Sequence, residues 1–234
     1  MLAILQARMS STRLPGKVMR PILGQPLIGR QIERLRRAHG ISRIMVATST
    51  REDDDVLAGY CHGLGVEVHR GELSDVLERF HGALVAAGRP DHFLRLTADC
   101  PLTEPAVIDL CISRHVESGA DYTHNTQDWT FPKGLDVEVC RTEVLEAAWW
   151  QACDPYDREH VTPFIYHRPD RFRIERVIRD PPLRFRWTVD TEEDFAFAYD
   201  VYAALYACKP DFGVDDVLDW QAEHPDRVLV NEAA

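Results

Sequence analysis

The chain has 234 residues, of which 45% are hydrophobic, and its formal net charge is −11 at pH 7. This length is enough for one domain with a sizeable core. It is too short to form two ordinary domains without strain. The negative charge argues against a broad surface for nucleic acid, because such surfaces neutralise phosphates with basic side chains. A small anion can still bind in a local basic pocket. We therefore predict a single domain over residues 1–234 and no nucleic-acid partner.

Cysteine usage and hydropathy indicate the compartment. The six cysteines are scattered without a C-x-x-C pair, so neither a zinc site nor a disulfide framework is indicated. No basic segment followed by an apolar stretch opens the chain, and no run of about 18 apolar residues occurs. We expect reduced, mostly buried thiols in a cytoplasmic protein with no membrane partner.

The first half of the chain alternates short apolar runs with segments of helical period. This alternation is typical of an α/β fold with three layers, in which helices cover a mostly parallel sheet. The expected strands are 2–5, 43–48, 66–69, 92–97 and 121–124, and the expected helices are 27–38, 52–62, 75–87 and 105–117.

The second half begins with a change of character. Residues 125–136 are rich in Trp, Phe, Pro and Gly and predict a loop, while residues 136–140 alternate like a strand at an exposed edge. Further helices are expected at 142–151, 159–166, 192–207 and 214–224, and further strands at 172–177 and 185–189. We expect an insertion at about 125–170 that serves acceptor binding or dimerisation, with Trp149 and Trp150 in the core or at a homodimer contact.

A long polar loop follows the first strand. It therefore lies at the carboxyl edge of the sheet, where α/β proteins bind ligands. Three cations, several hydroxyls and a permissive glycine fall within this loop, a composition that suits a bound triphosphate. The candidate ligands are Ala7, Arg8, Ser10, Ser11, Thr12, Arg13, Gly16 and Lys17. The spacing is not that of a Walker A loop. A surface loop with solvated cations remains the alternative.

Two aspartates end predicted strands at the same edge. Asp99 precedes a proline at position 101, and Asp190 follows the strand expected at 185–189. Magnesium on a triphosphate takes only one or two protein carboxylates, so we predict Asp99 and Asp190 as Mg²⁺ ligands. Helix capping competes for Asp190, which precedes a helix start. The acidic run at 53–55 is expected to be a solvated helix start.

Five motifs together carry a resemblance to a known family. They are ARMSSTRLPGK at 7–17, Arg70-Gly71 with Asp75-Val76-Leu77, TADCPL at 97–102, REHVTP at 158–163 and WTVDTEEDF at 187–195. The chain resembles the cytidylyltransferases that activate acidic sugars, such as the 3-deoxy-manno-octulosonate and acylneuraminate enzymes. It is most similar to the SpsF-like branch. The resemblance implies a Rossmann-like fold of the nucleotide-diphospho-sugar transferase type.

The resemblance also implies a reaction. A hydroxyl of an acidic sugar, of the nonulosonate type in the SpsF-like branch, would attack the α-phosphorus of CTP and release pyrophosphate, with Mg²⁺ bound. The implied catalytic residues are Arg8, Lys17 and Asp99, and the implied contacts to the nucleotide's base and ribose are Arg70, Gly71 and Asp75. Thr97 is a further predicted contact to the nucleotide. The acylneuraminate branch has one more aspartate where this chain has Thr188, so the simpler metal set is implied.

The acceptor is expected beside the metal. The string FPKGLDVE at 131–138 resembles the P-x-G-x-D-V-E segment of the SpsF-like branch. The predicted acceptor contacts are His124, Asn125, Asp136, Glu138, Arg158, Glu159 and His160. An ordinary hairpin with Gly134 in its turn is the alternative for the first group. A structural pair of Arg158 and Glu159 beside a packed histidine is the alternative for the second.

Three other functions compete with the leading one. A glycosyltransferase of the same fold would use a nucleotide sugar, but such enzymes usually carry D-x-D where this chain has Ala98-Asp99-Cys100. A cytidylyltransferase could also act on a different acid, such as a phosphonate. A non-enzymatic nucleotide-binding subunit is disfavoured, because Arg8, Lys17, Asp99 and Asp190 are all present.

Overall fold

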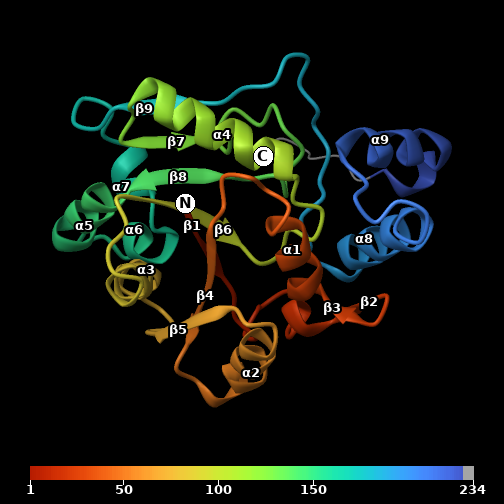
Figure 1. Ribbon diagram of the computed structural model, residues 1–234, viewed down its shortest axis with the longest axis horizontal. Coiled ribbons are helices and arrows are strands. Elements are labelled where there is room, and N and C mark those ends of the chain that lie inside the picture. The colour runs from red at the N-terminus through yellow and green to blue at the C-terminus, as the bar shows by residue number, and fades with distance from the viewer. Residues whose placement is uncertain (229–234) are drawn as a thin grey trace.

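A computed structural model describes residues 1–228 and builds them around a seven-stranded sheet (Figure 1). The strand order is β5-β4-β1-β6-β8-β7-β9. The strands are β1 Leu2–Gln6, β4 Arg43–Ser49, β5 Glu67–Gly71, β6 His92–Thr97, β7 Tyr122–His124, β8 Glu138–Arg141 and β9 Ile174–Arg176, and a small ribbon pairs β2 Pro21–Ile22 with β3 Gln25–Pro26.

Helices cover both faces of the sheet, which confirms the three-layer α/β class. One core cluster lies under α1 Leu27–Leu35, α2 Asp55–Gly63, α4 Pro105–Ser118, α8 Glu192–Leu205 and α9 Val214–Glu223. The other lies under α3 Val76–Ala86, α5 Thr142–Gln151 and α7 Pro163–Tyr166, with α6 Pro155–His160 packed on α3. In Figure 1, α3 and α5 lie to the left of the central strands, and α1 and α8 lie to the right.

The centre of the sheet is parallel, as predicted. β1 pairs in parallel with β4 and with β6, so Leu5 lies opposite both Val46 and Leu96. Residues 2–5 are each at most 2% exposed, because the strand is covered on both faces. β1 ends at Gln6, so the polar loop begins at the carboxyl edge of the sheet.

β8 corrects the prediction of an exposed edge strand at 136–140. It lies inside the sheet, antiparallel to both β6 and β7, and Glu138, Val139 and Cys140 are buried. The alternation of polar and apolar residues misled the prediction, because the polar member Glu138 faces a buried arginine rather than water. Since β8 runs in the opposite direction, the residues before it lie at the edge where β6 and β7 end.

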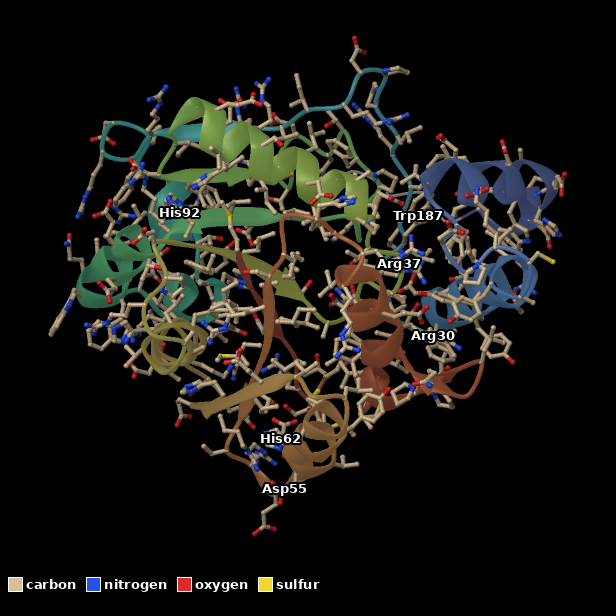
Figure 2. All side chains as sticks on the ribbon, viewed as in Figure 1. Arg30, Arg37, Asp55, His62, His92 and Trp187 are labelled. Carbon is tan, nitrogen blue, oxygen red and sulfur yellow. The ribbon has the colours of Figure 1, made fainter. Side chains whose placement is uncertain are left out.

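Two further predictions of elements were wrong. The expected helix at 159–166 is split, because Val161 adopts a φ of 74° after α6 and Pro163 begins α7. The expected strand at 185–189 is an extended segment with one isolated bridge, between Lys133 and Arg186. Its neighbour is a turn, which offers no continuous strand for pairing. Trp187 of this segment packs beside α9, where its indole donates to Gln221 at 3.1 Å (Figure 2).

The cysteines and the helix lengths can be compared with the expectations from composition. All six cysteines are free, and four of them are buried. Among residues 1–228, no helix combines the length and the apolar character that crossing a bilayer requires.

Candidate active site

The polar loop after β1 folds back on itself at Met9. The Met9 carbonyl accepts the N–H groups of Ser11 at 2.9 Å and Gly16 at 2.8 Å. Gly16 has a φ of 71°, which residues other than glycine rarely adopt. It begins the single turn Lys17–Met19. The loop thereby returns Lys17 to the sheet edge from which it started.

Asp54 holds this loop from the outside. Its Oδ1 accepts the N–H of Met9 at 2.7 Å, and its Oδ2 accepts the N–H and the hydroxyl of Ser49. Asp54 is only 1% exposed, so the expectation of a solvated run at 53–55 was wrong for its central member. The sequence showed that Asp54 begins a helical turn. It did not show that an N–H group 45 residues away would lie beside the carboxylate.

Lys17 joins the two aspartates that were predicted to hold a metal. Its ammonium donates to Asp99 Oδ2 at 3.0 Å, to Asp190 Oδ1 at 2.9 Å and to the Val189 carbonyl at 2.7 Å. Burial by itself would raise the pKa of Asp99 and lower that of Lys17. The opposite charges and the hydrogen bonds outweigh burial, so the pKa of Asp99 is lowered and that of Lys17 is raised. The two carboxylates therefore converge on one cation.

The side chain of Asp190 does not cap α8. Thr191 is the N-cap of α8, and its hydroxyl accepts the N–H of Asp194 at 3.2 Å. Asp194 in turn accepts the N–H groups of Asp190 and Thr191, each at 2.9 Å. Helix capping therefore falls to Thr191 and Asp194, and the Asp190 carboxylate contacts Lys17 and Arg13 instead.

A cavity of about 340 Å³ opens above this cluster. Its lining contains most of the predicted loop residues together with both aspartates. These are Ala7, Arg8, Ser11, Thr12, Arg13, Lys17, Thr97, Asp99 and Asp190, joined by Glu159 and His160 of α6. The cavity is polar and cationic on its loop side, so it can hold a small anion.

A second cavity of about 450 Å³ adjoins the first, because Arg95, Thr97 and His160 line both. Its walls combine aromatic and charged side chains. They include Asn125, Trp129, Phe131, Lys133, Asp136, Glu138, Tyr156 and Tyr166. The loop before β8 thus supplies one wall, at the edge where β6 ends.

Glu138 lines the second cavity, and both of its carboxylate oxygens accept hydrogen bonds. One oxygen binds the guanidinium of Arg95, and the other accepts the hydroxyls of Tyr122 and, at 2.6 Å, Thr162. Burial would raise the pKa of Glu138, but Arg95 and the two hydroxyls lower it. Glu138 is therefore an ionised residue whose oxygens are already occupied.

Asp136, by contrast, keeps one carboxylate oxygen without a hydrogen bond among residues 1–228. Its Oδ2 accepts the N–H of Gly134 at 3.1 Å. Burial raises the pKa of Asp136 to about 6, with a further increase from the negative charges of Asp99 and Glu138, against the lowering effects of the Gly134 donor and the positive charge of Lys133. Asp136 is thus an acidic group close to Asp99, and its own pKa of about 6 lies near neutral pH.

Comparison with known proteins agrees with this geometry. The family model described as cytidylyltransferase matches residues 2–209. The spore coat polysaccharide biosynthesis protein SpsF of Bacillus subtilis (strain 168) is 34% identical over 99% of this chain and 98% of its own length. The chain belongs to the cytidylyltransferase family. It is a CTP-using nucleotidyltransferase.

Solved structures extend the similarity of this cytidylyltransferase. A cytidylyltransferase from Leptospira borgpetersenii serovar Hardjo-bovis (strain JB197) has a TM-score of 0.91 and 27% identity, over 99% of this chain and 98% of that one. The CMP:2-keto-3-deoxy-manno-octonic acid synthetase complexed with CTP has a TM-score of 0.65, over 86% and 98% of the two chains. At 16% identity, this second likeness concerns the fold alone.

Several predicted nucleotide contacts of the cytidylyltransferase lie outside both cavities. Arg70 pairs at 2.6 Å with Asp55, which lies at the outer edge of the molecule in Figure 2. Gly71 packs against Arg79, and Asp75 is the N-cap of α3. Ser10 and Gly16 shape the loop without lining the cavity. The motifs did not separate the residues of the loop that line the first cavity from those that support it.

Three predicted acceptor residues are bound to partners within the protein. Arg158 donates to Asp75 at 2.6 Å and to two carbonyls at the end of α5, so it lines neither cavity. His124 is 1% exposed and stacks on Tyr122, and burial lowers its pKa. Asn125 reaches the second cavity, but its amide is bound to backbone groups of residues 135 and 137.

The sequence analysis missed two cationic residues in the second cavity. Arg95 is a charge inside an otherwise apolar buried strand, and that contrast was the available signal. Lys133 falls within the quoted string at 131–138 but was not selected. Neither residue type is unusual in itself, so their role becomes visible only when the cavity walls are assembled.

Proposed function

We propose that the protein transfers CMP from CTP to a hydroxyl of an acidic sugar of the nonulosonate type and releases pyrophosphate. The activated sugar would serve the synthesis of a surface polysaccharide or glycan, the process named for the similar SpsF protein. The convergence of Asp99, Asp190 and Lys17 at the mouth of the cationic loop is the observation that carries this proposal. An adjoining cavity then provides room for the acceptor.

The loop is assigned to the triphosphate. Arg8, Arg13 and Lys17 line the first cavity and can neutralise the pyrophosphate that leaves. The hydroxyls of Ser11 and Thr12 add neutral donors. Nucleotidyl transfer needs little covalent chemistry from the protein, so positioning and charge neutralisation dominate the rate. No residue is required to form a covalent intermediate.

Asp99 and Asp190 are assigned to a magnesium ion. Rv0371C from Mycobacterium tuberculosis, a solved structure with a similar fold, is a complex with manganese. Two converging carboxylates that already bind an ammonium fit such a cation. Among residues 1–228, no group of three or more His, Cys, Asp and Glu side chains gathers at one point to hold a metal unaided. Phosphate oxygens and water would complete the coordination. When bound, the ion neutralises charge on the reacting phosphate.

The acceptor is assigned to the second cavity. Asp136 and His160 line this cavity and remain as candidate contacts from the sequence, while Glu159 lines the first cavity and Glu138 binds Arg95 in the wall of the second. We further propose that the protein works in the cytoplasm as a homodimer. Trp150, which is 75% exposed at the end of α5, is the candidate contact in the dimer.

The test is a screen for pyrophosphate release. Each of the four nucleoside triphosphates is combined with Mg²⁺ and with legionaminate, pseudaminate, N-acetylneuraminate or 3-deoxy-manno-octulosonate. We expect release with CTP and at least one of these acids. Asp99→Asn should lower turnover by roughly a thousandfold or more while the fold persists, because a ligand of the reacting phosphate's counter-ion is removed.

The matched control is Asp200→Asn. Asp200 lies on α8, pairs with Arg227 at 3.1 Å and lines neither cavity. This variant should keep normal turnover. Near-normal turnover in Asp99→Asn would refute the metal assignment. Transfer from a nucleotide sugar without pyrophosphate release would favour the glycosyltransferase alternative.

A further inference from the structure

The three lysines of the chain have three different environments. Lys17 lies between Asp99 and Asp190, and Lys209 pairs with Asp216 at 2.8 Å. Lys133 lines the second cavity as an exposed side chain, and no carboxylate oxygen of residues 1–228 lies within 4.0 Å of its ammonium. Its charge acts only over a longer distance on Asp136 of the same cavity, whose pKa it lowers. An ammonium with no acidic partner in a cavity wall is available to a ligand.

The backbone holds Lys133 in place. Its N–H donates to the Phe185 carbonyl at 2.9 Å, and its carbonyl accepts the N–H of Trp187 at 2.7 Å. The next residue, Gly134, has a φ of 108°, and a Cβ there would lie 2.8 Å from backbone atoms of Trp187 and Thr188. The turn is therefore fixed against the 185–190 segment, so the lysine extends from a rigid support.

The other charged residues of the second cavity are poorly suited to bind an acidic ligand. Arg95 is neutralised by Glu138, whose oxygens are fully used. Asp136 contributes a negative charge that would repel an acid. Among the described residues, Lys133 is thus the lysine or arginine of this lining that has no carboxylate within 4.0 Å. Its ammonium lies 6.0 Å from the ring centre of Trp129, which lines the same cavity.

We infer that Lys133 binds the carboxylate of the acceptor and sets the preference of this enzyme for an acidic sugar. The inference rests on the proposed function and adds the residue that recognises the acid. The sugar body would lie against the aromatic wall of Trp129, Phe131 and Tyr166, with the carboxylate at the turn. The hydroxyl that attacks would then lie toward Arg95 and Thr97, which the two cavities share.

The experiment compares an acid with its uncharged methyl ester. The best acceptor of the panel above and its methyl ester are assayed with Mg²⁺ and CTP for wild type, Lys133→Gln, Lys133→Glu and Lys133→Arg. We expect Lys133→Gln to raise the KM for the acid roughly tenfold to a hundredfold, the usual scale for a lost charge-assisted bond. The KM for CTP and the kcat should stay near wild type, and Lys133→Arg should retain much of the affinity.

The preference between the two acceptors supplies a sharper readout. Wild type should favour the acid over its ester, Lys133→Gln should lose most of that preference, and Lys133→Glu should reverse it. Lys209→Gln is the matched control and should behave as wild type, since its lysine lines neither cavity. Thermal melting of each variant excludes a loss of folding.

Two results would overturn the inference, and one would overturn more than that. An unchanged preference in Lys133→Gln would mean that another group recognises the acid. Pyrophosphate release from CTP with neutral sugars alone would refute carboxylate recognition while leaving nucleotidyl transfer intact. No release from CTP with any acceptor would refute the proposed function itself, together with the inference.

Discussion

Asp136 illustrates how a candidate functional residue works against the stability of its own fold. It lines a cavity, it faces the negative charge of Asp99, and it has only the Gly134 N–H as a hydrogen-bond donor in the described chain. Burial raises its pKa from an ordinary value of 3.8 to about 6. The folded state therefore holds the proton more tightly than the unfolded chain does.

This difference predicts a pH-dependent effect of Asp136→Asn. Ionised Asp136 destabilises the fold, and the cost grows as pH rises from about 4 to about 6 and is constant above that. The asparagine keeps an oxygen for Gly134 but carries no charge. We expect the variant to be roughly 1–3 kcal/mol more stable than wild type near pH 7.5, and the gain to shrink near pH 4.5. Urea unfolding at both pH values measures it, and a less stable variant near pH 7.5 would contradict the argument.

At the residue scale, the sequence predicted which residues gather at the sheet edge better than it predicted their partners. Asp99, Asp190 and Lys17 were chosen because they end strands or lie in a cationic loop, and the structure brings them together. Arg158 was chosen by motif as well, but a guanidinium can reach in several directions. Its partner Asp75 lies 83 residues earlier in the chain, so no local pattern could identify the pair.

The pairing of Arg158 with Asp75 acts between elements. It ties the start of α3 to α6, and further bonds run from Arg158 to the carbonyls of Trp149 and Ala152 at the end of α5. Three helices on one face of the sheet thus meet at one guanidinium. The arrangement favours a structural role over contact with the acceptor.

Arg158→Gln tests this reading. We expect the free energy of unfolding to fall by about 1–3 kcal/mol, because a half-buried charge pair and two carbonyl partners are lost together. The KM values for CTP and for the acceptor should not change. Arg176→Gln serves as the comparison, since its pair with Asp128 is 63% exposed on the arginine side and should contribute less than about 1 kcal/mol. A large rise in the acceptor's KM for Arg158→Gln would restore the original prediction.

At the element scale, the parallel half of the sheet was predictable and the antiparallel part was not. A strand covered on both faces reads as a continuous apolar run, and β1, β4 and β6 do so. The burial of β8 could not be predicted, because the strand contains the charged residue Glu138. Arg95 on the neighbouring strand neutralises this charge. The 185–190 segment is placed by bonds to a turn and to the Asp99 carbonyl, which no periodicity records.

On the scale of the whole molecule, both cavities open at one edge of the sheet. β1 and β6 deliver the loop and Asp99 to this edge with their carboxyl ends, whereas β8 delivers Asp136 with its amino end. The chain carries a net charge of −11, whereas the lining of the first cavity includes the cations Arg8, Arg13, Lys17 and Arg95, where the anionic substrate is proposed to bind. Binding should therefore be local and should stabilise the fold.

This predicts a thermal shift that needs both carboxylates. A complex of Mg²⁺ and CTP at about 100 times its Kd should stabilise the fold by roughly 2.7 kcal/mol, which corresponds to a rise in Tm of about 5–10 °C for a chain of this size. Asp190→Asn should lose most of this shift, and Asp200→Asn should keep it. An undiminished shift in Asp190→Asn, measured by calorimetry, would remove that residue from the metal site.

The amide of Asn125 has a consequence for how this enzyme can diversify. Its two bonds, 2.8 Å each, join the beginning of the loop after β7 to the Leu135 carbonyl and the Val137 N–H just before β8. The loop is thereby closed at its base, independently of the residues at its tip. The side chains of Trp129 and Lys133 can then change while Asp99 and Asp190 keep their places. The backbone at Lys133 and Gly134 cannot change as freely, because it packs against the 185–190 segment. We therefore expect related chains to vary the side chains of this loop, and with them the proposed acceptor, while the proposed nucleotide site stays constant.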